Sequence, residues 1–148
     1  MTAVFIGVLL ILLVALTCEV TYAFSDKAAL QADLKTHSTN EAYVTSTYGD
    51  ISTWNVSLVT DMSYLIHDIS CRQTFNGDIS GWNVSSVTNM EGIFYQASAF
   101  NQAIGVWNVS SVTNMRYMFG SASAFNQAIG AWNVSSVTDM IGMFKGAS

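Results

Sequence analysis

The feature that most constrains this chain is a phrase of nine residues that recurs four times. Each copy opens with a tryptophan, at Trp54, Trp82, Trp107 and Trp132. Successive tryptophans are 28, 25 and 25 residues apart, and the two full repeats, 82–106 and 107–131, agree at 19 of 25 positions. Self-similarity at a fixed period of this size indicates a stacked array, because a single repeat cannot bury its apolar face alone.

The apolar residues within one repeat predict its local structure. They are Trp82, Val84, Val87, Met90, Ile93, Phe94, Ala97, Phe100 and Ile104. Four of them, from Met90 to Ala97, fall at i, i+3, i+4 and i+7, which is the spacing of one helical face. Residues 82–85 alternate between apolar and polar, as a half-buried strand does. The sequence therefore predicts an α/β solenoid, in which each coil contains a short strand and a short helix.

The segments that flank the repeats differ from them in composition. Residues 24–50 are predicted to form an N-terminal helical cap, with a helix over residues 25–35 that Ser25 caps. The repeat region covers residues 51–148, and its last coil is incomplete and lacks a C-terminal cap. Since terminal caps normally keep an array soluble, we expect either a fragment of a longer array or an end that docks onto a partner.

The first 23 residues have the pattern of a targeting segment. Val4 to Leu16 is almost wholly apolar, which is too short for a typical spanning helix, and small residues precede a cleavage site after Ala23. The prediction is a signal peptide over residues 1–23 and a secreted or cell-surface location. Two alternatives stay open: an uncleaved N-terminal anchor and a lipid anchor at Cys18. Either one would attach the chain to a membrane.

Composition excludes several classes of function. The net charge is −5 and only five residues are Lys or Arg, so the chain lacks the basic surface that binds nucleic acid. No Cys and His cluster has metal-ligand spacing, and we expect no cofactor and no metal. His37 is expected to be a solvated side chain of the cap, His67 a loop residue, and Cys71 a partly buried free thiol. No nucleophile and base are suitably spaced, so the chain is predicted not to be an enzyme.

Two sets of residues are candidates for contact with other molecules. Four Asn-Val-Ser triplets fit the glycosylation pattern and predict a glycoprotein, with acceptors at Asn55, Asn83, Asn108 and Asn133. The alternative for such asparagines is an internal ladder, for which Asn76, Asn101 and Asn126 are better placed. Five of the six differences between the full repeats cluster in the predicted helical stretch. They supply the candidate partner contacts, Glu91, Tyr95, Gln96, Arg116 and Tyr117; neutral drift on an exposed surface is the alternative.

The phrase WNVSSVTNM, followed by MF and ASAFNQAIG, resembles the repeat of the BspA-like leucine-rich repeat surface proteins, which mycoplasma-type surface lipoproteins share. The resemblance covers residues 50–148. It implies a leucine-rich-repeat-like solenoid, a surface location, and adhesion to or binding of extracellular macromolecules, with no catalytic residue.

The sequence thus predicts a non-enzymatic binding or adhesion module. Its partner would be an extracellular protein or glycan that contacts several coils of a rigid platform. The alternative is a structural protein that assembles end to end, with self-association through the C-terminal edge.

Overall fold

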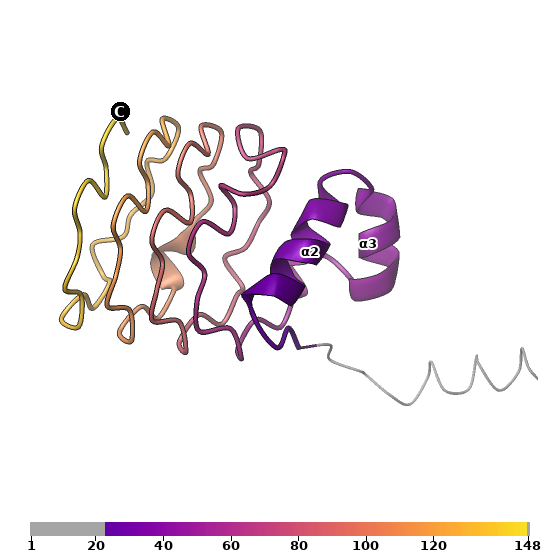
Figure 1. Cartoon of the computed structure of the whole chain (residues 1–148), viewed down its shortest axis with the longest axis horizontal. Coiled ribbons are helices and arrows are strands. Elements are labelled where there is room, and N and C mark those ends of the chain that lie inside the picture. The colour runs from indigo at the N-terminus through magenta and orange to yellow at the C-terminus, as the bar shows by residue number, and fades with distance from the viewer. Residues whose placement is uncertain (1–22, 148) are drawn as a thin grey trace, which may run out of the picture.

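The computed structural model describes residues 23–147, apart from the side chains of residues 42 and 43. The predicted signal peptide, residues 1–23, lies outside this range except for Ala23. Two helices, α2 and α3, stand at one end of a row of stacked coils, and the last described repeat stands at the other end (Figure 1).

Helix α2, Lys27–His37, overlaps the helix predicted for residues 25–35. Its N-cap is Asp26 rather than Ser25: a side-chain oxygen of Asp26 accepts a hydrogen bond of 2.9 Å from the backbone N–H of Ala29. Leu30 and Leu34 are spaced i and i+4 and are fully buried. This spacing places both leucines on one face of the helix, so α2 is held by a narrow apolar stripe.

Helix α3, Glu41–Tyr48, was not predicted from the sequence. It buries Val44 and is followed by a short 3-10 helix, η1, over Ile51–Thr53. The helical segment is also tied to the first repeat, because Lys27 Nζ donates a hydrogen bond of 3.0 Å to Ser63 Oγ. The helices therefore cover the first repeat, as Figure 1 shows.

The prediction of strand-plus-helix coils, and with it a leucine-rich-repeat-like solenoid, is wrong. The described part of the repeat region, residues 51–147, contains no α-helix and no extended strand. Its regular elements are η1 and a second 3-10 helix, η2, over Ile104–Val106. The rest consists of turns, and single parallel bridges join equivalent positions of successive repeats: Asp61 to Asn89, Asn89 to Asn114, and Asn114 to Asp139.

The stretch that has helical spacing is not helical because its backbone donors bond to the next repeat. The N–H of Gly92 donates to the Arg116 carbonyl over 2.8 Å, and the N–H of Phe94 donates to the Met118 carbonyl over 3.0 Å. In an α-helix these groups would bond four residues back. Gly92 also has a φ of 55°, in the left-handed region, which interrupts a helix.

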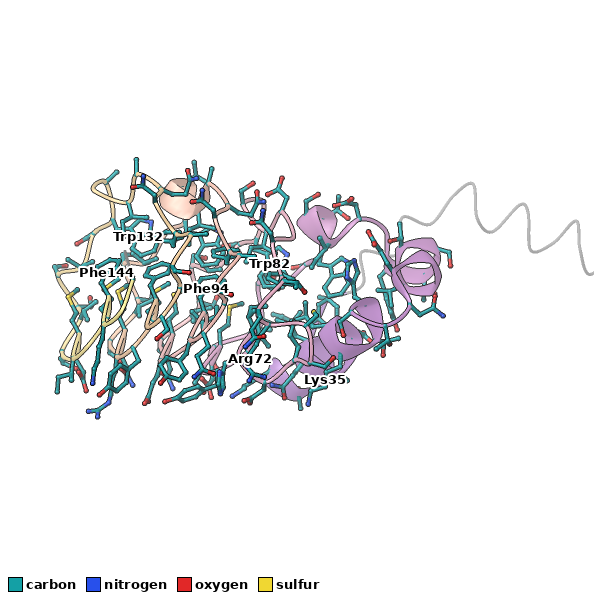
Figure 2. All side chains as sticks on the ribbon, turned by 90° about the horizontal axis from the view of Figure 1, so that it is seen from above. Lys35, Arg72, Trp82, Phe94, Trp132 and Phe144 are labelled. Atoms are coloured by element: carbon teal, nitrogen blue, oxygen red, sulfur yellow. The ribbon has the colours of Figure 1, made fainter. Side chains whose placement is uncertain are left out.

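The predicted core is confirmed, since all nine apolar positions named for residues 82–106 are buried. Phenylalanine rings continue in columns through the stack. Phe94 and Phe119 lie 5.5 Å apart, and Phe119 lies 5.5 Å from Phe144. Figure 2 labels Phe94, which is fully buried, and Phe144, which is 49% exposed on the last described repeat. Phe94 is thus covered by Phe119, and Phe119 by Phe144.

Three of the repeated tryptophans, Trp82, Trp107 and Trp132, hydrogen-bond across the stack through their indole groups. Trp82 Nε1 donates to the Ile51 carbonyl over 2.8 Å, and Trp107 Nε1 donates to the Ile79 carbonyl over 3.1 Å. Trp132 Nε1 makes the equivalent bond of 3.2 Å to the Ile104 carbonyl. Each of these three carbonyls also accepts the backbone N–H three residues further on, so the indole is a second donor that links two segments of the stack.

Candidate binding surface

The structure brings four of the five candidate partner contacts together on one part of the stack. Two residues that the sequence did not single out for this role, Tyr64 and His67, join them. We call this group the tyrosine ridge; it consists of Tyr64, His67, Glu91, Tyr95, Arg116 and Tyr117. All six side chains are half-buried, so each is held in place yet reaches solvent.

The aromatic rings of the ridge form a continuous row. The centroid of the His67 ring is 5.7 Å from that of Tyr64 and 5.2 Å from that of Tyr95. The centroids of Tyr95 and Tyr117 are 6.1 Å apart. These separations are typical of aromatic pairs that attract each other. The row crosses the first three repeats and exists only because the repeats are stacked.

The tyrosines fit because glycines lie opposite them in the next repeat. The Tyr64 ring lies against Gly92, and the Tyr117 ring against Gly142; a side chain on either glycine would collide with the ring. Tyr64 and Tyr117 themselves have φ of 54° and 50°. Tyrosine and glycine therefore alternate at one left-handed position of successive repeats. Gly92 is buried, because the Tyr64 ring covers it.

Hydrogen bonds to the Glu91 carboxylate also hold the tyrosine ridge in place. The Tyr64 hydroxyl donates to Glu91 Oε1 over 3.0 Å, and Asn114 Nδ2 donates to Glu91 Oε2 over 3.1 Å. Burial raises the pKa of Tyr64 above its ordinary value, and the hydrogen bond to Glu91 acts in the same direction. Glu91 therefore helps to keep Tyr64 a neutral donor.

Arg116 completes this network. Its Nε lies 4.0 Å from Glu91 Oε1, and its Nη1 lies 3.8 Å from Asp139 Oδ2. The guanidinium carbon also stands 5.0 Å from the centroid of the Tyr117 ring, within the range of a cation–π contact. Three repeats thus contribute to the position of one arginine.

Gln96, the fifth candidate contact, lies next to the ridge but is not joined to it by a side-chain contact among those described. Its backbone has a φ of 61°, and its N–H donates to the Gly120 carbonyl over 2.8 Å. Sequence reasoning missed His67 because the first repeat is three residues longer than the others. Aligned on the 28-residue spacing, His67 falls at the position of Tyr95, so that alignment was the available signal.

The candidate glycosylation sites form local turns. Asn83 Oδ1 accepts hydrogen bonds from the backbone N–H and the hydroxyl of Ser85, over 3.2 and 2.7 Å. The equivalent backbone bond occurs at each of the other three sites. Three of the four side chains are exposed, and Asn55 is half-buried. Their amide nitrogens make no hydrogen bond among the described contacts, so the structure leaves the acceptor atom of the triplet accessible.

Asn76, Asn101 and Asn126 form the predicted ladder, but it lies at the surface of the stack and not inside it. Asn76 Oδ1 accepts a bond of 2.9 Å from the backbone N–H of Asn101. Asn101 in turn accepts one of 2.9 Å from the backbone N–H of Asn126. Asparagine thus has two roles. Asn76 and Asn101 link successive repeats, whereas Asn83 and its equivalents stabilise a turn within one repeat.

His37 and Cys71 are packed against neighbouring residues of the fold. The centroid of the His37 ring lies 5.9 Å from that of Trp54, edge to face, and the histidine is half-buried rather than solvated. Cys71 is a half-buried free thiol, as predicted. Within residues 23–147, His, Cys, Asp and Glu form no group that could hold a metal ion. In the same range, no helix has both the length and the apolar character needed to cross a bilayer.

Comparison with known proteins identifies the family of the repeat region. A family model described as "Mycoplasma protein of unknown function, DUF285" matches residues 37–148. No curated protein and no solved structure matches the chain. The matched segment contains every residue of the tyrosine ridge.

Proposed function

The chain belongs to the DUF285 family of Mycoplasma proteins of unknown function, and from that premise we propose that it is a non-enzymatic binding module. It would be secreted or displayed at the cell surface and would bind an extracellular macromolecule through the tyrosine ridge. The observation that carries the proposal is the continuous row of half-buried aromatic rings, with Arg116 stacked on its end.

The composition of the ridge suits contact with a macromolecule. Tyrosine and arginine are enriched among the residues that contribute most to binding energy at protein interfaces. The rings of the ridge are already fixed by their neighbours, and Arg116 is held between Glu91 and Asp139. Little side-chain freedom would be lost on binding, which favours affinity.

The repeats also differ where the ridge lies. Residues 91–96 and 116–121 contain five of the six differences between two otherwise matching repeats, and four of the ridge residues fall there. The resemblance of the repeat phrase to BspA-like surface proteins supports adhesion as the role. A surface that binds a partner would be expected to vary between repeats.

Binding to immobilised macromolecules tests this proposal. Surface plasmon resonance would be measured over fibronectin, laminin, collagen and mucin, which sample protein and glycan ligands. A double variant, Tyr95→Gly with Tyr117→Gly, removes two rings but places at each position the residue that a neighbouring repeat already has, Gly120 or Gly142. We expect saturable binding to at least one macromolecule and at least a tenfold weaker affinity in the double variant. The absence of saturable binding, or equal affinity, would contradict the proposal.

A second candidate function, end-to-end assembly, is favoured by the last described repeat. It exposes large apolar side chains, including Ile141, which is 58% exposed, and Phe144. Apolar residues gathered on one face often mark an interface. Light scattering after size exclusion would show oligomers that grow with concentration and are lost in the variant Ile141→Ser with Phe144→Ser. A monomer at all concentrations would rule this function out.

A further inference from the structure

The asparagine ladder begins at the one place in the chain where an asparagine is followed by glycine, Asn76-Gly77. The equivalent pairs in the next two repeats are Asn101-Gln102 and Asn126-Gln127. Asn76 is exposed, and the backbone N–H of Gly77 donates no hydrogen bond to any residue that the structure describes. The peptide nitrogen that follows Asn76 is therefore available to react with the asparagine side chain.

The ladder bond activates the side-chain carbonyl of Asn76. The backbone N–H of Asn101 donates to Asn76 Oδ1 over 2.9 Å. Attack on the Asn76 Cγ would place negative charge on this oxygen, and a backbone N–H that is already directed at it stabilises that charge. Asn101 has the same kind of donor, the N–H of Asn126 at 2.9 Å. The two asparagines therefore differ mainly in the residue that follows, because glycine has no side chain to hinder the approach of its nitrogen and adopts more backbone conformations than glutamine.

We propose that Asn76 is a site of spontaneous modification, at which the folded protein converts this asparagine to isoaspartate and aspartate. The Gly77 nitrogen loses its proton to solvent base and bonds to the Asn76 Cγ. The bond between Cγ and Nδ2 breaks, and Nδ2 leaves as ammonia, which leaves a five-membered succinimide ring. Water then opens the ring at one of its two carbonyl carbons. Opening at Cγ gives aspartate, and opening at the backbone carbonyl carbon gives isoaspartate.

The modification would loosen the link between two repeats. Asn76 accepts two hydrogen bonds from the next repeat: its Oδ1 accepts the N–H of Asn101, and its backbone carbonyl accepts Gln102 Nε2 over 2.8 Å. Aspartate keeps both acceptors and adds a negative charge. Isoaspartate instead lengthens the main chain by one methylene and shortens the side chain, so both acceptors move away from their donors. The protein would thus age at the start of its asparagine ladder.

Peptide mass spectrometry tests the site. The folded full chain would be incubated at mildly alkaline pH and digested with pepsin in acid, where no further deamidation occurs; electron-transfer fragmentation then separates isoaspartate from aspartate. We expect Asn76 to react about tenfold faster or more than Asn101 and Asn126, a difference of about 1.4 kcal/mol in the barrier. The rate at Asn76 should rise with pH, because the Gly77 nitrogen must lose its proton. No conversion at Asn76, or equal rates at the three asparagines, would overturn the proposal.

Two variants exchange the residue that follows the asparagine. Gly77→Gln gives the first pair the residue of the next two repeats and should stop the modification, whereas Gln102→Gly should make Asn101 react. An unchanged rate at Asn76 in Gly77→Gln, or an inert Asn101 in Gln102→Gly, would overturn the role of the following residue.

Thermal unfolding tests the loosening of the ladder. The Tm of the unmodified sequence should fall by about 3 °C or more after incubation, as expected for the loss of one or two hydrogen bonds. The Tm of Gly77→Gln, incubated in the same way, should not change. A constant Tm in the unmodified sequence, or an equal fall in both proteins, would contradict the loosening. Neither readout depends on ligand binding by the tyrosine ridge.

Discussion

The ring of Tyr95 lies against Gly120 of the next repeat, where an added Cβ would stand 2.8 Å from Cδ2 of the tyrosine. Equivalent contacts join Tyr64 to Gly92 and Tyr117 to Gly142. At these three contacts a tyrosine in one repeat lies against a glycine at the same position of the next. This alternation lets half-buried tyrosines stand at the spacing of the stack without pushing the repeats apart.

The contact predicts a large effect at Gly92. The change Gly92→Ala places a methyl group against the Tyr64 ring at a position whose φ is 55°, so it combines a collision with backbone strain. We expect the free energy of unfolding to fall by about 2–3 kcal/mol, measured by urea denaturation. The matched control is Gly130→Ala, because nothing lies within 4 Å of a Cβ at that position. Equal stability losses in the two variants would show that the Tyr64 contact is absent.

The column of phenylalanine rings predicts that the same substitution, Phe→Ala, lowers the free energy of unfolding by different amounts at two equivalent positions. Phe119 is fully buried between Phe94 and Phe144, so Phe119→Ala should lower the free energy of unfolding by about 3–5 kcal/mol. Phe144→Ala removes a half-exposed ring and should cost about 1 kcal/mol or less. Chemical denaturation of both variants checks the prediction. A larger loss of stability from Phe144→Ala than from Phe119→Ala would contradict the burial of Phe119 between the other two rings.

The indole bonds between repeats predict the result of replacing a tryptophan by phenylalanine. Trp107→Phe keeps an aromatic ring but removes the indole donor from the buried Ile79 carbonyl, which keeps only its bond from the backbone N–H of Trp82. The loss of this bond should cost about 0.5–1.5 kcal/mol beyond any change in packing. Trp54→Phe is the comparison, since Trp54 Nε1 makes a longer bond of 3.4 Å to the Gly49 carbonyl. Thermal unfolding should show the larger loss at position 107, and the reverse order would argue against the bond.

Asp78 predicts a dependence on pH. Its side chain accepts hydrogen bonds from the backbone N–H and hydroxyl of Ser80, which lower its pKa below the ordinary value of 3.8. A lowered pKa in the folded state stabilises the protein above pH 3.8, and this stabilisation is lost as pH falls through the folded pKa. Asp78→Ala, which introduces the residue that Ala103 provides in the next repeat, should lower the Tm slightly at pH 7. The difference should vanish near pH 2, and a difference that grows in acid would contradict the assignment.

The repeat period and the buried positions could be predicted from the sequence because large apolar residues recur in it at a fixed spacing. Trp82, Phe94 and Phe100 recur with the period, and each is buried. Helical spacing from Met90 to Ala97 was misleading, since a tight series of turns can bury the same positions. What distinguishes the two is the acceptor of each N–H, which for Phe94 is Met118 in the next repeat. The sequence of a single repeat does not show which carbonyl accepts each N–H.

The candidate site could be predicted only in part, for a related reason. Glu91, Arg116 and Tyr117 were found because they differ between two repeats of equal length. His67 was missed because its repeat is three residues longer, and Tyr64 because it was not compared with Gly92. Their role depends on contacts between repeats, such as the 5.2 Å separation of His67 and Tyr95, which no pattern within one repeat expresses.

The most direct test of the central claim, that the tyrosine ridge is the binding surface, is the ratio of two dissociation constants. Tyr117→Gly removes one ring of the ridge and leaves a residue that tolerates the left-handed backbone there. Val106→Ala changes an exposed side chain outside the ridge to the residue that the next repeat has at Ala131. Both would be measured by surface plasmon resonance against the macromolecule of the panel that binds the unmodified chain most tightly. We predict that Tyr117→Gly raises Kd at least tenfold, or about 1.4 kcal/mol, while Val106→Ala leaves it unchanged. Equal dissociation constants in the two variants would contradict the account.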